Sequence, residues 1–241
     1  MWIVLTQAAD ESALWVYQRL RARSRGDVRI VLLEELDVAT TSWTHDVGRD
    51  GARTRVRLGD GRCLETIGSG AVLNRLARPP VALLTAGPPV EATYASSEMH
   101  AFAMSWIRSL APVVVNAPTA QGLSGRWRPA LHWRQLAARA GLPVVPLHLT
   151  STDPSAAAGN GDGPSAVVLA VGGELVGSCA PPAVRQAVRR LAALADTAIL
   201  GLRFSGTDPT SGGWRLLDAS PQPDLRAAGE SGVAALEALA R

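Results

Sequence analysis

The chain has 241 residues, of which 47% are hydrophobic and 19% are charged, and its formal net charge is +3. This composition supports a buried core and excludes an intrinsically disordered chain. No apolar run approaches the roughly 20 residues that span a bilayer, and the start, MWIVLTQAAD, lacks the basic region of a signal peptide, so we expect a cytoplasmic protein without membrane contact.

The first predicted elements form a β-α-β unit, which favours a parallel sheet. An apolar strand over 2–6 leads into a helix that Asp10 can cap, and a second strand is expected over 28–36. The turn between strand and helix lacks a glycine-rich fingerprint, which argues against a dinucleotide site there. The alternating segment 53–67, with Gly-Asp-Gly at 59–61, predicts a hairpin.

The middle of the chain is expected to alternate strands and helices. A strand begins at residue 70 and ends before a loop that contains Asn74, Arg75 and Arg78. The next predicted elements are, in chain order, a helix over 91–110, a strand over 113–118, a helix over 128–141 and a strand over 142–150. Residues 151–165 are rich in Gly, Ser and Ala, which predicts a linker.

A second lobe is predicted from residue 166 to residue 241, after a first lobe over 1–150. Its expected elements are a hairpin over 166–180, a helix over 181–198, strands over 199–206 and 213–220, and a helix over 231–241. The last strand brings Asp218 and Ser220 to a turn.

The order of these segments resembles the ATP-grasp superfamily, in particular the ligase-like maturases of ribosomally made peptides. The first lobe is similar to their amino-terminal domain in VLNRLARPP (72–80) and in the long segment from VVVNAP to PLHLT (113–150). The second lobe is similar in VVLAVGGELVGS (167–178), LAALADTAILGLRFS (191–205) and WRLLDASPQPDL (214–225). The resemblance implies an α/β fold with a pre-ATP-grasp-like parallel-sheet lobe followed by a truncated ATP-grasp-like carboxy-terminal lobe.

Departures from the family pattern imply a degenerate member. The sequence contains no lysine, and the lysine-bearing sheet that closes on the nucleotide in this family is missing between the two lobes. Asp218 and Ser220 stand where the resemblance implies glutamate and asparagine, and Arg203 stands where an aspartate is common. Because magnesium prefers several oxygen ligands, three interpretations of Asp218 remain open: a magnesium ligand, an ion pair with Arg203, or an exposed turn.

A ligand site is predicted at the strand ends of both lobes, where open α/β sheets bind their ligands. The candidate residues are Asn74, Arg75, Arg78, Asn116, Arg126, Arg128, Arg203 and Asp218. Gathered arginines suit a carboxylate, a phosphate or an acidic peptide, and solvated loop charge is the alternative. The sequence assigns no catalytic residue, and its widely spaced histidines and two cysteines predict no metal site.

The expected function is a non-catalytic recognition or scaffold protein in a biosynthetic pathway, with no cofactor. Its partner would be an acidic peptide, a small acidic molecule or a modifying enzyme, and no nucleic-acid motif is present. A homodimer is a further expectation, since a missing lid sheet would leave apolar surface. The alternative is an ATP-dependent carboxylate–amine ligase with an atypical arginine-based site, or with a site completed by a partner chain.

Overall fold

The computed structural model describes residues 1–23, 26–38, 40–81, 88–146, 165–178, 180–205 and 214–240. These residues form two compact units. Unit 1 comprises Met1–Arg126 together with Glu237–Arg241, and unit 2 comprises Trp127–Leu236. In the described part of the chain, no helix combines the length and apolar character that a membrane crossing requires.

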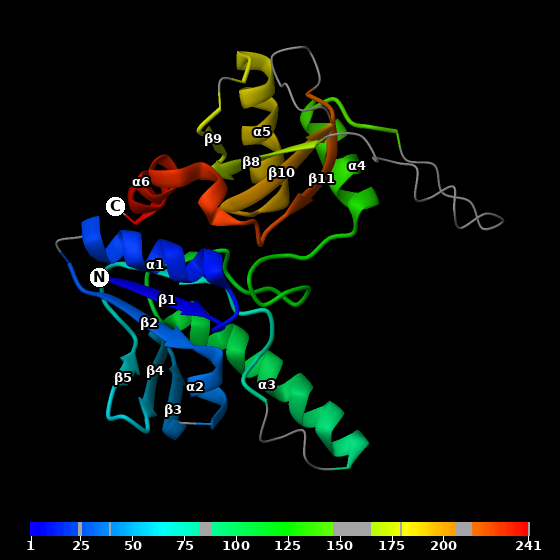
Figure 1. Cartoon of the computed structure of the whole chain (residues 1–241). Helices are drawn as coiled ribbons and strands as arrows, with labels where there is room; N and C mark the ends of the chain where they lie inside the picture. Colours follow the sequence, from blue (N-terminus) through cyan, green and yellow to red (C-terminus); the bar gives the residue numbers. More distant parts are fainter. Residues whose placement is uncertain are drawn as a thin grey trace. The chain divides into compact units, whose positions relative to one another are not determined.

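Unit 1 is built on a parallel sheet in the order β2-β1-β6-β7. Figure 1 shows β1 and β2 in blue beside helix α1. The strands are β1 (Trp2–Thr6), β2 (Val28–Leu32), β6 (Ala71–Asn74) and β7 (Val113–Val115). Helix α1 (Glu11–Arg23) connects β1 to β2, so the predicted β-α-β start is confirmed. Asp10 caps this helix as predicted, because its Oδ1 accepts a hydrogen bond from Ala13 N at 3.0 Å.

Helix α2 (Leu33–Val38) replaces the second half of the strand predicted over 28–36. Leu33 and Leu36 are three residues apart and both buried, which is the spacing of one helix face. Two glutamates occupy the first turn, where carboxylates favour a helix start. The apolar run over 30–33 therefore crosses the boundary between strand and helix without a sequence signal.

A three-stranded antiparallel sheet completes the strands of unit 1. It consists of β3 (Thr40–Gly48), β4 (Gly51–Leu58) and β5 (Cys63–Glu65). The hairpin predicted over 53–67 is confirmed as β4 and β5. The sequence prediction omits β3 because polar residues dominate that strand.

Helix α3 (Pro89–Ser109) packs against the antiparallel sheet through aromatic and polar contacts. Trp43 of β3 lies edge-on to the fully buried Trp106, with ring centroids 5.2 Å apart. Beside this pair, the His45 ring is hydrogen-bonded to the Ser105 hydroxyl of α3 at 2.8 Å. These contacts belong to the core of unit 1, which also takes side chains from β1, β2 and β6.

Unit 2 has an antiparallel sheet in the order β11-β10-β8-β9. Its strands are β8 (Ser165–Val171), β9 (Glu174–Val176), β10 (Ile199–Ser205) and β11 (Leu216–Ser220). The core side chains of this sheet pack against α4 (Ala130–Ala140) and α5 (Pro182–Ala195). A 3-10 helix, η3 (Leu225–Ala228), and α6 (Gly229–Leu239) end the chain. The predicted hairpin, helix and two strands of the second lobe are confirmed.

Contacts group α4 and the residues after it with unit 2, although the sequence analysis assigns residues up to 150 to the first lobe. The reason is that α4 packs on α5 and β11, and Val144 forms a parallel bridge to Leu216. Of the strand predicted over 142–150, the structure describes residues 142–146, which form this isolated bridge. The described residues do not include 147–150, the predicted linker as far as residue 164, or Cys179. The division into a first lobe over 1–150 and a second lobe over 166–241 stays a prediction.

Gly70, just before β6, supplies a test of this fold. Its φ is +116°, and a Cβ there would overlap the Met1 carbonyl oxygen. We expect Gly70→Ala to lower the free energy of unfolding by at least about 2 kcal/mol in urea denaturation. Gly68→Ala is the matched control, because no atom lies within 4 Å of its Cβ position. Equal urea midpoints for the two variants would contradict the described chain path.

Candidate functional site

The sheet face of unit 2 opposite α4 and α5 carries a pocket of about 470 Å³. Alternation along β10 directs Leu202 toward the helices and Arg203 toward this face. The register places Val167, Arg203 and Asp218 in one row across three strands. We call this the sheet-face pocket; its lining residues are Val167, Gly201, Arg203, Asp218, Ala219, Ser220, Pro223, Asp224 and Ala227.

Arg203 and Asp218 lie directly opposite each other on β10 and β11, as the sequence analysis expects. The ion pair, one of the three interpretations of Asp218, is not formed: within the described residues, no salt bridge joins these two side chains. Asp218 instead turns one oxygen to its own strand, where Oδ1 accepts from Ala219 N at 2.8 Å. Arg203 is exposed and lines the pocket, so its guanidinium donors are available on this face of the sheet.

A β-bulge sets the position of Asp218. The register between β10 and β11 shifts after Arg203, so that Phe204 pairs with Leu216 and Leu217 is the extra residue. The Leu217 carbonyl accepts a hydrogen bond from Arg134 Nε at 2.8 Å. An arginine of α4 therefore satisfies the carbonyl that the bulge removes from the ladder.

Arg134 is a site residue that the sequence analysis misses. Its side chain is buried and also donates to the carbonyls of Val145 and Pro146 at 3.1 and 3.2 Å. Burial lowers the pKa of this guanidinium, whereas Asp218 raises it and Arg203 lowers it further. The only sequence signal is its helical spacing: Trp133, Leu136 and Ala137 around it form the buried face of α4.

The turn after β11 is held against β10 by close packing. A Cβ on Gly201 would lie 2.6 Å from Cβ of Pro223, so glycine lets the turn approach the strand. Within the turn, Ser220 Oγ accepts from Gln222 N at 3.1 Å. Asp224 caps η3 by accepting from Arg226 N, and its carboxylate also pairs with the Arg226 guanidinium at 2.8 Å.

This donor set does not fit a magnesium ion. The lining carboxylates are Asp218, which faces a cation, and Asp224, which Arg226 engages. Magnesium needs near-octahedral oxygen coordination. Across the described segments, no three His, Cys, Asp or Glu side chains gather as a metal centre would require.

The candidate residues at the strand ends of unit 1 bond mainly to protein groups. Asn74 is fully buried and donates to the carbonyls of Asn116 and Leu123 at 3.3 and 2.7 Å. Asn116 itself is buried with φ of 54°. In the same unit Arg75 Nε pairs with Asp10 at 2.9 Å. These contacts connect β6, α1 and the loop after β7.

The remaining candidates divide between the two units. Arg78 pairs with Asp37 at 2.6 Å in unit 1, where Arg126 keeps a buried Nε that has no acceptor among the described residues. In unit 2, the Arg128 cation lies 5.1 Å from the Trp133 ring centroid and donates to a carbonyl at the end of α5. The structure therefore brings Arg203 and Asp218 together, and a ligand site at the other six residues stays a prediction.

Known structures identify the fold. No protein-family model and no curated protein match the chain. The ATP-grasp ligase PsnB, complexed with a phosphomimetic variant of its minimal precursor, Mg and ADP, is similar with a TM-score of 0.67 at 17% identity, over 100% of this chain and 98% of that chain. The macrocyclase MdnC from Microcystis aeruginosa MRC, bound with precursor peptide MdnA, has a TM-score of 0.72 at 13% identity over 100% of both chains.

The chain has the fold of the ATP-grasp ligases. A third structure agrees: the RiPP-associated ATP-grasp ligase of Chryseobacterium gregarium, in complex with ADP and a leader and core peptide, has a TM-score of 0.64 at 8% identity over 97% of this chain and 95% of that chain. The predicted α/β class and the predicted ATP-grasp resemblance are confirmed.

The Asp10–Arg75 pair yields a prediction for the strand ends. Both side chains are largely buried, at 13% and 7% exposure, so Arg75→Met leaves a carboxylate without its cation. We expect a loss of about 3 kcal/mol in the free energy of unfolding, measured in urea at pH 7. Arg29→Met breaks an exposed pair with Asp27 and should cost less than about 1 kcal/mol. Similar losses in both variants would contradict the buried pairing.

The bulge contact predicts a second difference in stability. Arg134→Met leaves the Leu217, Val145 and Pro146 carbonyls without their donor, which should cost about 2–4 kcal/mol. Arg139→Met, at an exposed position of the same helix, should change the free energy of unfolding by no more than about 0.5 kcal/mol. Denaturation by urea separates the two cases, and a silent Arg134→Met would remove the role given to this arginine.

Proposed function

We propose that this chain is a non-catalytic recognition protein of a peptide biosynthetic pathway. Its sheet-face pocket binds the carboxylate of an acidic peptide or small acidic molecule. The fold supports a role connected with peptides, because the structures that share it include PsnB with its precursor and MdnC with precursor peptide MdnA.

The observation that carries the proposal is the pair formed by Arg203 and Asp218. They lie opposite each other without bonding, and within the described residues Arg203 makes no ion pair. A guanidinium in this state offers two parallel donors to an incoming carboxylate. Asp218 beside it offers an acceptor to a peptide N–H, so the row suits a ligand that carries both groups.

The same residues argue against phosphoryl transfer. That chemistry depends on positioning and on cations that neutralise the phosphates. The sequence has no lysine, and the pocket lining does not fit magnesium. Each lost electrostatic contact of this kind typically costs on the order of 3–4 kcal/mol of transition-state stabilisation. The loss of several such contacts would therefore make phosphoryl transfer very slow.

The experiment is calorimetric titration of the full chain with a blocked tetraglutamate peptide. We expect binding that Arg203→Gln weakens at least about tenfold, because the variant loses the charged donor. The matched control is Arg215→Gln, an exposed arginine outside the pocket lining, and it should bind as the parent does. Equal affinity of the two variants, or absence of binding, would refute the pocket assignment.

A thermal shift assay tests the non-catalytic part of the proposal. Millimolar ATP with magnesium should leave the melting temperature unchanged, because a nucleotide that does not bind the folded protein cannot stabilise it. A rise of several degrees that Asp218→Asn abolishes would support the alternative, an ATP-dependent carboxylate–amine ligase. Co-purification of a modifying enzyme would support a scaffold role, and the homodimer expected from the sequence stays a prediction.

A further inference from the structure

Strand β2 is the open edge of the parallel sheet in unit 1, since β1 pairs with it on one side and the order β2-β1-β6-β7 ends there. Alternate residues of a strand point their N–H and C=O groups to opposite sides. Asp27 accepts from Trp2 N on the β1 side, so Val28, Ile30 and Leu32 face the open edge.

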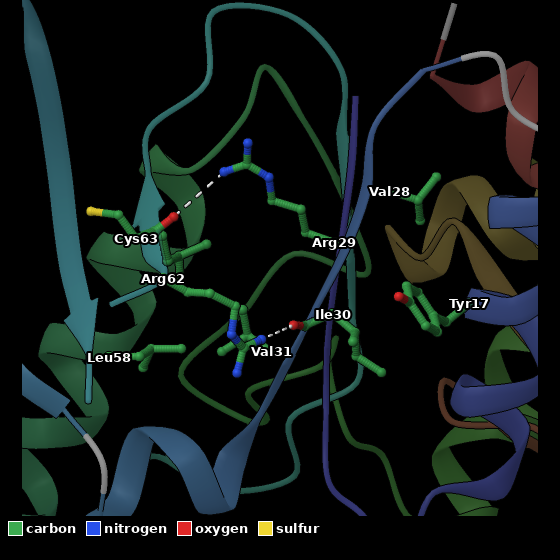
Figure 2. A pocket seen from close by; sticks show the side chains of 9 residues that line it. Tyr17, Val28, Arg29, Ile30, Val31, Leu58, Arg62 and Cys63 are labelled. Atoms are coloured by element: carbon green, nitrogen blue, oxygen red, sulfur yellow. Dashed lines mark hydrogen bonds between the residues drawn. The ribbon is translucent and has the colours of Figure 1, made fainter. Parts of the chain in front are cut away.

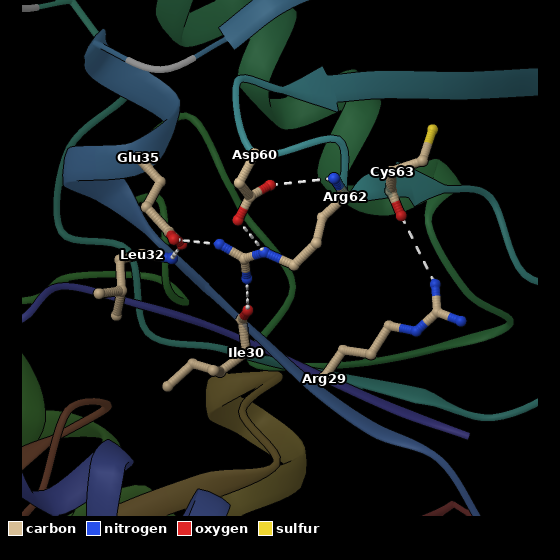
Figure 3. Close-up of polar contacts among 7 residues, drawn as sticks. All are labelled: Arg29, Ile30, Leu32, Glu35, Asp60, Arg62 and Cys63. Atoms are coloured by element: carbon tan, nitrogen blue, oxygen red, sulfur yellow. Dashed lines mark hydrogen bonds and ion pairs between the residues drawn. The ribbon is translucent and has the colours of Figure 1, made fainter.

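Two side chains already bond to this edge, which shows that the backbone groups of Ile30 and Leu32 point away from β1. Figure 3 shows Arg62 donating to the Ile30 carbonyl at 3.2 Å, and Glu35 accepting from Leu32 N at 2.9 Å. Arg62 and Glu35 also bond to each other, and Asp60 holds the same guanidinium and raises its pKa. One donor and one acceptor thus occupy the positions that a neighbouring strand would fill near Leu32.

A pocket of about 340 Å³ continues along the rest of the edge. In Figure 2, Tyr17 of α1 lies on one side of β2, and Leu58 and Cys63 of the antiparallel sheet lie on the other. Arg29 reaches from β2 toward the Cys63 carbonyl, at 3.5 Å. The full lining is Tyr17, Val28, Arg29, Ile30, Val31, Leu58, Arg62, Cys63 and Leu64.

The lining defines the chemistry of an occupant. It is mostly apolar, and among the described residues that line it the charged members are Arg29 and Arg62, with no carboxylate. The pair between Arg29 and Asp27 is more than half exposed on both sides and is therefore weak enough to exchange for another carboxylate. Backbone groups on an open edge recognise an extended chain through main-chain hydrogen bonds.

We propose that the β2 edge groove takes an extended peptide as an added strand, with an apolar side chain in the pocket and an acidic side chain at Arg29. The peptide pairs with the edge at Val28 and at the N–H of Ile30, and the Arg62–Glu35 pair marks where the pairing ends. The choice of a peptide rests on the proposed function, whereas the edge and its pocket are independent of the sheet-face pocket in unit 2.

The test is fluorescence anisotropy of a labelled heptapeptide of alternating valine and glutamate, titrated with the full chain. Ile30→Pro removes the edge N–H and leaves the groups that face β1 in place, a position where proline is tolerated. We expect Ile30→Pro to weaken binding at least about tenfold and Ile30→Val to bind within about twofold of the parent.

A second probe keeps the test decisive if Ile30→Pro does not fold. The same heptapeptide with alternate backbone nitrogens methylated cannot donate along one edge, and it should lose binding to the unmodified protein. Equal binding of both peptides, equal binding by Ile30→Pro and Ile30→Val, or no binding of the first peptide would overturn the proposal. Binding that Arg203→Gln abolishes and Ile30→Pro preserves would overturn the edge groove while leaving the proposed function intact.

Discussion

The antiparallel register between β10 and β11 is the constraint on which the candidate site depends. It sets Arg203 opposite Asp218 on the face away from the helices, and the bulge at Leu217 lies directly before Asp218. The bulge is stable because Arg134 donates to the freed Leu217 carbonyl. Gly201 then lets Pro223 pack on β10, and both residues line the pocket. A change at any of these positions moves the charged pair.

Because the sequence has no lysine, arginine serves in place of it throughout the chain, and it has the same two roles in both units. Buried arginines serve the fold: Arg75 pairs with Asp10, and Arg134 connects α4 to β11. A guanidinium suits this work because its planar set of donors can reach several carbonyls at once, whereas a lysine amine is a single point charge. Exposed arginines, such as Arg29 and Arg203, line the two pockets. The chemistry available to a ligand is therefore recognition of carboxylates and backbone carbonyls.

Much of the fold and part of the site could be predicted from sequence. The strand patterns on either side of residues 207–212 were enough to place Arg203 and Asp218 on adjacent strands. The missing ion pair was not predictable, because Asp218 bonds to the next backbone amide in place of the arginine. The role of Arg134 depends on a carbonyl 83 residues away, and no local pattern records such a contact. Helix α2 and strand β3 were missed because an apolar run suits helix or strand, and a polar strand has no clear alternation.

We propose that the sheet-face pocket recognises an anion through Arg203 and does not bind a metal–nucleotide complex. The most direct measurement is a crystal structure grown with manganese and a non-hydrolysable ATP analogue, with anomalous scattering used to locate the metal. We predict no manganese peak at Asp218 and no nucleotide in the pocket. A manganese ion coordinated by Asp218, with the analogue's phosphates beside it, would show that the pocket is a nucleotide site and would refute the proposed function.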